Sequence, residues 1–457
     1  MKRYRLLAWS ERKIRQMRPT RIIVLTFLAI IFVGALLLTL PIAQRAAGRT
    51  DFFTALFTAV SAVSVTGLTL VDTVTHWSHF GQAVILVLIQ IGGLGFMSII
   101  SIFYFMLNRR LGLRERLVMM ESMNLDEMDG VVTLVKRVLV GTLLFELAGA
   151  IVLSAHFIPE FGWGGGIWRG VFLAVSAFCN AGFHLMGTHG MFSGMTTYVG
   201  SPVVLITTAM LILVGSTGFY VWGDILNRRR LKRFHIYTKL VLIITAVLVT
   251  GGMLMYLLME WSNPNSLGSL PVGERFLVAF FQSISTRTAG FDVIGQLTVT
   301  DDTKLLSILF MFIGGSSGST AGGVKTVTIG ILVLSAISVL RGRQDLIVFG
   351  RKIAPGQIVN AMTLVSIGVL IVLGGSIFLF RTEGVSLISA IFETTSAYGT
   401  AGLSIGVLDM LGHGEKILLM CLMFFGKIGV LSLSIAFMMR GRGAMTHTYP
   451  TEHVIIG

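Results

Sequence analysis

The feature of this sequence that most constrains its fold is a twelve-residue pattern that the chain writes four times. Each copy opens on Phe, continues through small, hydroxyl and apolar side chains, and closes on Gly followed by Leu or Phe. The copies are FTAVSAVSVTGL at 57–68, FLAVSAFCNAGF at 172–183, FFQSISTRTAGF at 280–291 and FETTSAYGTAGL at 392–403. They recur about every 110 residues, and a fixed period of this kind indicates repeated structural units. Four related units in one chain predict a pseudo-fourfold arrangement around a common axis.

Composition places these units in a membrane. Of the 457 residues, 54% are hydrophobic and only 13% are charged, whereas soluble domains have about 25% charged residues. We predict an all-α integral membrane protein of four covalently linked helix–pore-loop–helix repeats, with eight spanning helices and four re-entrant pore helices. The predicted repeats cover 22–107, 131–226, 238–340 and 357–440, between tails at 1–21 and 441–457. Their expected spans are 22–40, 80–107, 131–157, 202–226, 240–258, 305–340, 358–380 and 417–439.

The front and the tail of each copy have different expected roles. The front suits a helix of about 10–12 residues, too short to cross a hydrocarbon core that needs about 20, so we interpret it as re-entrant. The tail contains a glycine, which permits positive φ and lets backbone carbonyls turn inward. Four such tails would form rings of carbonyl oxygens that replace the hydration shell of a cation. The candidate filter residues are Val65, Thr66, Gly67, Asn180, Ala181, Gly182, Thr288, Ala289, Gly290, Thr400, Ala401 and Gly402.

The distribution of charge gives an orientation. The net charge is +14, and the basic residues gather in the N-terminal tail and at 109–116, 228–233 and 341–352, which flank apolar spans. Such flanks are cytoplasmic by the positive-inside rule, which places both termini in the cytoplasm. The same basic runs suit docking of a cytoplasmic partner or of anionic lipid, and their location argues against nucleic acid. Acidic residues after the filters would raise the local cation concentration or are solvated loop residues: Asp72, Asp292, Asp301, Asp302 and Asp409.

A glycine-rich segment interrupts the predicted span at 305–340. Each Gly in a helix costs up to about 1 kcal/mol relative to Ala, and non-helical backbone at membrane depth is tolerated where it lines a cavity or is buried in protein. We interpret the segment as a gate loop that lies across the pore beneath the filter with few packed contacts; a kink for close helix packing is the alternative. Its residues are Gly314, Gly315, Ser316, Ser317, Gly318, Ser319, Thr320, Ala321, Gly322 and Gly323.

We single out three ionisable residues inside predicted spans or pore helices as candidates: Lys427, Glu146 and Glu393. Lys427 is a lone cation in the last span, and intramembrane charges usually face an interior or a water-filled cavity. It is a candidate pore barrier, with an ion pair to Glu393 or Glu146 as the alternative. For both glutamates structural hydrogen bonding is favoured over a part in transport. In the second filter, the side chain of Asn180 is an alternative to its backbone as a cation ligand.

Enzyme chemistry has little support in the sequence. The two cysteines and nine histidines show no disulfide framework, metal-ligand spacing or catalytic pairing. Glycines such as Gly92-Gly93-Leu94-Gly95 lie inside an apolar segment, where helix packing explains them. No cofactor is expected in this chain. A rival function is a sodium-coupled secondary symporter, which would predict inverted halves, whereas these copies share one orientation.

On these motifs the chain resembles the Trk/Ktr/HKT potassium transporter superfamily over nearly its whole length, and within it the membrane (KtrB-like) subunit of a bacterial Ktr system. The resemblance implies potassium uptake across the bacterial plasma membrane, with the ion bound at filter backbone carbonyls and 314–323 as the intramembrane gate. In that family, glycine in all four filters goes with potassium preference and serine in the first goes with sodium. The family usually has Arg where this chain has Lys427.

The resemblance also implies an assembly. It predicts a homodimer among membrane lipids, gated by a cytoplasmic ring of nucleotide-binding regulatory subunits (KtrA-like), with sodium as a possible activator. None of this follows from composition.

Overall fold

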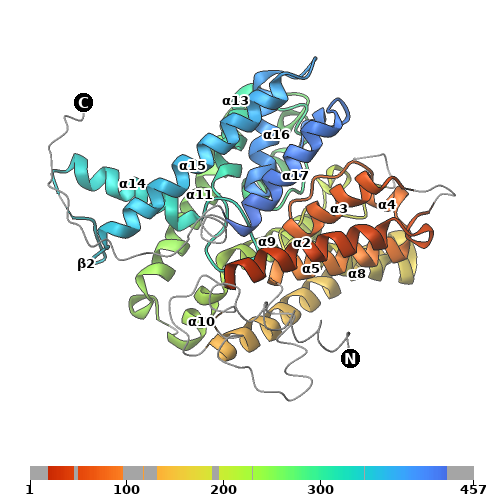
Figure 1. Ribbon diagram of the computed structural model, residues 1–457. Coiled ribbons are helices and arrows are strands. Elements are labelled where there is room, and N and C mark those ends of the chain that lie inside the picture. Colours follow the sequence, from red (N-terminus) through yellow and green to blue (C-terminus); the bar gives the residue numbers. More distant parts are fainter. Residues whose placement is uncertain are drawn as a thin grey trace, which may run out of the picture.

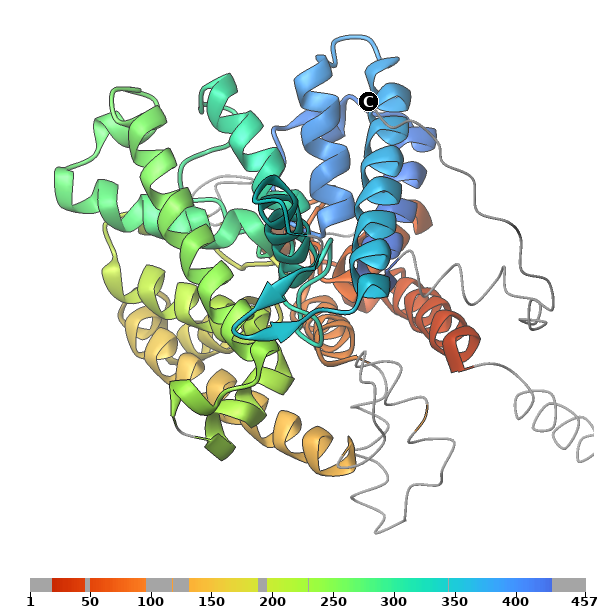
Figure 2. The same cartoon turned by 90° about the vertical axis from the view of Figure 1, so that its left-hand side faces the viewer.

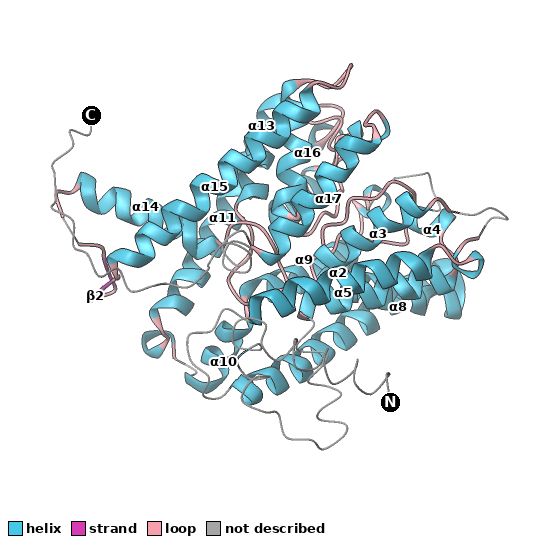
Figure 3. Cartoon of the chain, in the orientation of Figure 1, coloured by secondary structure: helices cyan, strands magenta, loops and turns pink. Residues whose placement is uncertain are grey.

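The computed structural model of the chain is almost entirely helical (Figure 3). It describes residues 19–45, 50–95, 117, 131–187, 195–228, 230–343 and 345–429. The longer helices are α2 (Pro19–Leu38), α3 (Phe52–Ser64), α5 (His79–Leu94), α8 (Val131–Phe178), α9 (Pro202–Thr217), α10 (Phe219–Arg228), α11 (Ile236–Glu260), α12 (Val272–Thr288), α13 (Asp301–Phe312), α14 (Thr326–Leu340), α15 (Pro355–Phe380), α16 (Leu387–Gly399) and α17 (His413–Ile428). Short helical turns are α4 (Thr73–His76), η1 (Pro41–Ala43), η3 (Thr196–Tyr198), η4 (Leu231–Arg233), η5 (Leu267–Ser269) and η6 (Val407–Asp409).

Each helix that precedes a copy of the pattern is long and apolar. α2, α8, α11 and α15 are long and apolar enough to cross a membrane, and α9 with α10 makes a fifth span if that bent pair is counted as one. Large apolar side chains such as Phe32, Leu258 and Leu370 are exposed on them, as suits helices that face lipid. The expected eight spans and four re-entrant helices remain a prediction, because the described residues contain four or five such helices.

The second copy of the pattern follows its preceding helix without a loop. α8 contains both the predicted span at 131–157 and the front of the second copy. Gly162 has φ +73° and ψ 172°, which is not helical, and Pro159 lies just before it. Proline removes a helical hydrogen bond and glycine tolerates the left-handed φ. α8 is therefore two helices joined at a sharp kink.

Three of the four helices that follow a copy end at a glycine of positive φ, whereas α13, after the third copy, ends at Phe312 just before the segment Gly314–Gly323. α5 ends at Gly95 (φ +77°), α9 at Gly218 (φ +97°) and α17 at Gly429 (φ +85°). α9 and α10 are bent by 91° at Gly218, so the region of the span predicted at 202–226 is not one straight helix. Gly95 also ends its helix, which differs from the continuous helix expected at 80–107. The later parts of the predicted spans 80–107 and 417–439 lie outside the described residues.

The front of each copy forms a helix in the centre of the molecule. α3 packs against α2, α5 and α17, while α12 packs against α11, α13 and α9. α16 packs in the same way against α15, α17 and α13 (Figure 1). Each central helix therefore contacts the helix before it, the helix after it and the helix that follows the previous copy. This pattern of contacts closes a circle.

A smaller second core carries the β-hairpin, which Figure 2 brings toward the viewer. Strands β1 (Ile347–Val348) and β2 (Arg351–Lys352) pair antiparallel, with Ile347 opposite Lys352. The core beneath them consists of Val221, Leu240, Val241 and Val327, with Val348 packed against it. These two short strands are a minor departure from the all-α prediction.

Candidate functional site

The glycines of the four copies form a closed ring. A Cβ added to Gly67 would lie 3.1 Å from Gly182 Cα, one on Gly182 would lie 3.3 Å from Gly290 Cα, and one on Gly290 would lie 3.1 Å from Gly402 Cα. A Cβ on Gly402 would lie 3.2 Å from Gly67 Cα, which closes the ring. Gly182 and Gly402 are therefore opposite members, as are Gly67 and Gly290.

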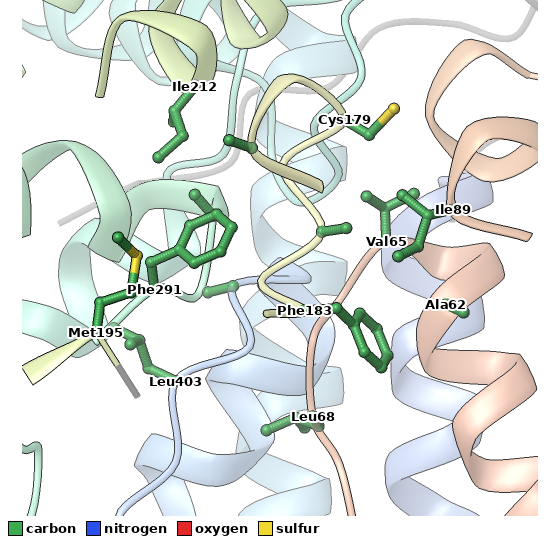
Figure 4. Packing of buried hydrophobic residues seen from close by; sticks show 14 of the residues in the cluster. Ala62, Val65, Leu68, Ile89, Cys179, Phe183, Met195, Ile212, Phe291 and Leu403 are labelled. Atoms are coloured by element: carbon green, nitrogen blue, oxygen red, sulfur yellow. The ribbon is translucent and has the colours of Figure 1, made fainter. Parts of the chain in front are cut away.

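Backbone carbonyls explain why each ring position requires glycine. An added Cβ would approach the carbonyl oxygen of Ala181 to 2.6 Å from Gly67, that of Ala289 to 2.8 Å from Gly182, and that of Ala401 to 2.6 Å from Gly290. From Gly402 it would meet Thr66 O. The neighbour is backbone in every case and cannot rotate away. The residues after the glycines are Leu68, Phe183, Phe291 and Leu403, and they reach the same core from four separate segments (Figure 4).

Three of the four turns have the same geometry. Val65, Asn180 and Thr400 end their helices in the left-handed region, with φ of +57°, +59° and +51°. The next N–H then donates to the Ser carbonyl five residues earlier, as Thr66 N does to Ser61 O at 2.9 Å. Left-handed backbone costs a non-glycine residue roughly 1–2 kcal/mol. These turns therefore hold strain at the ring, as functional sites often do.

The third copy is one residue shorter than the other three. Ser285 lies five residues before Gly290, whereas Ser61, Ser176 and Ser396 lie six residues before their glycines. α12 continues to Thr288, and no left-handed residue precedes Gly290. Phe281 is fully buried like the opening Phe of the other copies, and Phe280 is only partly buried. The copy therefore begins structurally at Phe281, not at Phe280 as its letters suggested.

The side chain of Asn180 is engaged by protein groups. With its amide oriented to satisfy both ends, Oδ1 accepts from Thr288 Oγ1 at 2.7 Å. Nδ2 then donates to Ala177 O at 3.2 Å and to Ile212 O at 3.3 Å. These bonds tie the second turn to the third. They favour the backbone carbonyl of Asn180, and not its side chain, as the group available to an ion.

The segment Gly314–Gly323 joins α13 to the chain before α14 and is hydrogen-bonded to the second copy and to the helix after it. Thr320 Oγ1 donates to Phe178 O at 3.1 Å, at the C-terminus of α8. Ser316 N donates to Ser216 O at 3.0 Å, at the end of α9. Gly318 O accepts from Phe219 N at 2.8 Å, and Ser317 O accepts from Tyr237 Oη at 2.9 Å. The expectation that this loop has few packed contacts is wrong.

The same loop also reaches the fourth copy. Gly323 N donates to Gly426 O at 3.2 Å, and a Cβ on Gly322 would lie 2.8 Å from Thr400 Cγ2. Because the second and fourth glycines are opposite members of the ring, the loop runs from one side of the ring to the other. It does so on the side of the central-helix C-termini.

Two lysines hold consecutive carbonyls of this loop. Lys427 Nζ donates to Thr320 O at 2.6 Å, and Lys325 Nζ donates to Ala321 O at 2.8 Å. Both side chains are partly buried, and neither makes an ion pair with any residue that the structure describes. The alternative of a pair between Lys427 and Glu146 or Glu393 is therefore not observed. Two lysines therefore hold the loop at neighbouring residues.

The buried glutamates are engaged in hydrogen bonds. Glu393 Oε1 accepts from Ser404 Oγ at 2.6 Å and from Ile405 N at 3.0 Å, which ties α16 to the segment after its glycine. Glu146 Oε2 accepts from Gln90 Nε2 at 3.1 Å, and Cys179 Sγ lies 3.9 Å from Glu146 Oε1. These contacts agree with the structural part expected for both residues.

The acidic residues after the filters also have structural partners. Asp72 is 5% exposed and accepts from Val74 N and Thr75 N at 2.9 Å, as the cap of α4. Asp292 accepts from the N–H groups of Ile294, Gly295 and Gln296. Asp301 is exposed and pairs with Lys304 at 2.9 Å. Asp72 is therefore a buried cap and not a solvated loop residue, while Asp292 is a partly buried loop residue held by the backbone that follows it.

Two features of the site were missed in the sequence. The first is a second recurrent pattern, Gly-x-x-Gly, at the break after every copy: 92–95, 215–218, 315–318 and 426–429. Lys427 occupies the second position of this pattern, where the other copies have Gly93, Ser216 and Ser316. The second feature is Lys325. It could have been found in the sequence as a lone cation in an apolar span, two residues after Gly323.

Comparisons with known proteins show what the chain is similar to. Residues 3–447 match the family model of TrkH, described as a cation transport protein. The chain is 37% identical to the potassium/sodium uptake protein NtpJ of Enterococcus hirae, over 98% of this chain and 99% of that one. It is 38% identical to the Ktr system potassium uptake protein B of Bacillus subtilis, over 92% of this chain and 93% of that one. The crystal structure of the potassium transporter TrkH from Vibrio parahaemolyticus superposes with a TM-score of 0.71, at 19% identity, over 92% of this chain and 84% of that one.

Proposed function

Because the chain belongs to the TrkH family of cation transport proteins, whose members are multi-pass membrane transporters and not enzymes, we propose that it takes up potassium through a pore at the glycine ring. The observation that carries this proposal is the closed contact of four glycines from four copies of one pattern. Carbonyl rings can replace the hydration shell of a cation. The twelve candidate filter residues lie at this ring or next to it.

The helices around the ring support cation binding. Their C-termini converge on it, and a helix C-terminus carries a partial negative charge equivalent to roughly half an elementary charge. Thr400 Oγ1 and Ser316 Oγ are buried and have no hydrogen-bond partner among the described residues. Buried hydroxyls without a protein partner suit a path that carries water or an ion. The proposed architecture is the four-repeat, eight-span pore with re-entrant helices α3, α12, α16 and the end of α8.

We assign the gate to Gly314–Gly323. The loop lies across the ring between its second and fourth members, and it donates hydrogen bonds to backbone carbonyls of the second copy and of the helices after the second and fourth copies. Such bonds contribute about 1 kcal/mol each, so the loop is held firmly and can still be released. Lys427 and Lys325 add positive charge on the same path, and Lys427 is the proposed barrier to the ion.

The assembly is proposed on the names of the relatives. The Bacillus subtilis relative is part of a Ktr system, so a separate regulatory component is proposed for this chain too, as a ring of nucleotide-binding subunits. The Enterococcus hirae relative is a potassium/sodium uptake protein, which supports an effect of sodium on this chain. A homodimer in the bacterial plasma membrane, with cytoplasmic termini, completes the proposal.

Reconstituted flux tests this function against the symporter. The purified full-length chain in liposomes is given a potassium gradient with no sodium on either side, and uptake is followed at several imposed voltages. A channel-like pore predicts potassium flux without sodium, and its direction should reverse at the potassium equilibrium potential. Flux that requires sodium and stays coupled to it would favour a sodium-coupled symporter and overturn the pore.

A further inference from the structure

A strongly basic cavity lies where α10 gives way to α11, beside the β1–β2 hairpin. It has a volume of about 590 Å³, and its lining includes Arg228, Lys232, Arg233, Lys239 and Arg351. None of its lining residues is a carboxylate. Five cations around one cavity repel each other unless an anion balances them. The cavity belongs to neither the ring nor the gate loop.

The cationic side chains of this cavity differ in whether they have hydrogen-bond or ion-pair partners in the protein. Arg228 forms an ion pair with Asp224 at 2.9 Å and donates to Arg233 O at 2.7 Å. Lys239 Nζ donates to Lys232 O at 3.1 Å and lies over the ring of Phe349, 5.5 Å from its centroid. Within the described parts of the chain, the side chains of Lys232, Arg233 and Arg351 make no hydrogen bond or ion pair. The positive charge of these three remains unbalanced.

Apolar side chains are exposed beside these charges. Leu231 precedes Lys232 and is 72% exposed, while Phe349 lines the cavity and is 53% exposed. Leu226, on the last turn of α10, is also exposed. A small soluble anion would make no favourable contact with exposed apolar side chains. An anionic lipid would place its headgroup beside the cations and its acyl chains along the apolar side chains. The combination therefore favours a lipid.

The cavity is built on packed structure. The second core, with Val221, Val241 and Val327, supports α10, α11 and α14, and Val348 of the hairpin packs against it. Asp224 also accepts from His235 N at 2.9 Å, which fixes the start of α11. The N-terminus of that helix adds partial positive charge to the cavity wall. The cations are consequently arranged before any ligand arrives.

We propose that this cavity binds the headgroup of an anionic phospholipid. The phosphate lies between Lys232, Arg233 and Arg351, and the acyl chains run along Leu231 and Phe349. Basic pockets between membrane helices at the cytoplasmic side are established binding places for acidic headgroups. Arginine offers a planar fork that suits two phosphate oxygens. Arg228 does not take part, because its charge is balanced by Asp224.

A direct binding measurement tests the proposal. Short-chain phosphatidylglycerol is titrated into the full-length protein in neutral detergent, with short-chain phosphatidylcholine as the uncharged comparison. The double variant Lys232→Gln/Arg233→Gln should bind phosphatidylglycerol about tenfold or more weakly than the parent, since each surface cation contributes appreciably to binding an anionic lipid. The matched control is Arg341→Gln/Arg343→Gln, which removes two exposed cations outside the cavity and should bind like the parent.

Two further experiments distinguish binding of a lipid phosphate from binding of free inorganic phosphate. Inorganic phosphate should compete poorly with phosphatidylglycerol, and Leu231→Ser should weaken phosphatidylglycerol binding while leaving phosphate binding unchanged. Equal affinity for inorganic phosphate and for the lipid would make the cavity a free-anion site and overturn the lipid assignment. Equal affinity of the cavity variant, the control variant and the parent for phosphatidylglycerol would overturn the site itself, and would leave the cations to a protein partner. All variants change exposed residues, and gel filtration verifies that they fold.

Discussion

The helices before the copies and the helices after them differ in whether they break at a glycine. Before the copies, α2, α11 and α15 are continuous, and two of their glycines face open space: a Cβ on Gly251 or Gly374 would meet nothing within 4 Å. After the copies, α5, α9 and α17 stop at a glycine of positive φ, close to the C-terminus of the central helix. The preceding helices form an outer wall, and the following helices all break at one level beneath the ring.

The third copy departs from this common plan twice. Its filter turn is one residue shorter, and its break is extended from a single glycine into the loop Gly314–Gly323. The loop then donates hydrogen bonds to carbonyls that lie at the other breaks, such as Ser216 O and Gly426 O. A shared break beneath the ring thus becomes a long loop in one unit only, and the second and fourth units provide hydrogen-bonding groups that hold it.

The largest expected effect comes from a glycine at a break. In Gly426→Ala the new Cβ would meet Tyr398 O, and it would lie 3.1 Å from Thr400 Cγ2. Because the carbonyl is backbone, the clash requires movement of a helix, which costs about 1–3 kcal/mol or more. We expect lower thermal stability and loss of most potassium flux. Gly374→Ala in α15 is the control and should be neutral or stabilising by up to about 1 kcal/mol; similar losses in both variants would break the comparison.

The second effect concerns Lys427, which stands where the other breaks have Gly93, Ser216 and Ser316. If its ammonium lies about 6 Å from the ion path, it repels a monovalent cation by about 3 kcal/mol at an effective dielectric constant near 20. Such a barrier slows passage by up to about a hundredfold. Lys427→Gln should raise potassium flux per folded molecule, and Lys427→Arg should roughly preserve it.

Folded yield and flux are measured together for these Lys427 variants. Lys416→Gln, near the other end of α17, controls for loss of one cation and should leave flux unchanged. A fall in folded yield with no rise in flux per molecule would show that Lys427 acts as a structural clamp on Thr320 O and not as a barrier.

Thr320 offers a smaller change at the contact between the gate loop and the second copy. Thr320→Val removes the hydrogen bond to Phe178 O, which is worth about 1 kcal/mol. Loosening the loop by that amount should raise potassium flux about fivefold. Thr363→Val is a suitable control, because Thr363 Oγ1 bonds only Val359 O in its own helix. Unchanged or reduced flux for Thr320→Val would argue that the loop supports the pore and does not obstruct it.

The smallest expected effect is at Tyr237, where α11 holds the loop from outside the pore. Tyr237→Phe deletes the bond from Tyr237 Oη to Ser317 O and should raise flux about twofold, at the low end of the value of one hydrogen bond. Flux assays of the reconstituted variant against the parent measure it. A larger effect than that of Thr320→Val would place the main restraint on the loop in α11, and would weaken the comparison drawn here.

The sequence was sufficient for the ring and for the position of the loop. The period of the pattern and its closing glycines predicted four equivalent positions, because only glycine tolerates both the positive φ and the adjacent carbonyl. The loop was predicted because five of its ten residues are glycine inside an apolar span. In both cases the local residue types state the backbone requirement directly.

Other features of the fold and the site depend on contacts between distant residues, which cannot be predicted from the local sequence. The bond from Thr320 Oγ1 to Phe178 O joins residues 142 apart, so the firm hold on the loop could not be predicted. The shift of the third copy was hidden by two adjacent phenylalanines, Phe280 and Phe281, only one of which is fully buried. The sequence predicts continuous helix across Gly95 and Gly218, because an apolar run has the same composition on both sides of a bend, but the helices break at both glycines.

We propose that the glycine ring selects potassium over sodium, and the variant Gly67→Ser tests this proposal. A side chain at Gly67 would meet Ala181 O at 2.6 Å from its Cβ, which must displace a carbonyl of the second turn. We expect potassium-over-sodium selectivity, measured as relative uptake in liposomes, to fall sharply in this variant. In Gly162→Ser, which has φ +73° but nothing within 4 Å of its Cβ, selectivity should be unchanged. Unaltered selectivity in folded Gly67→Ser protein would contradict the claim that this ring is the filter.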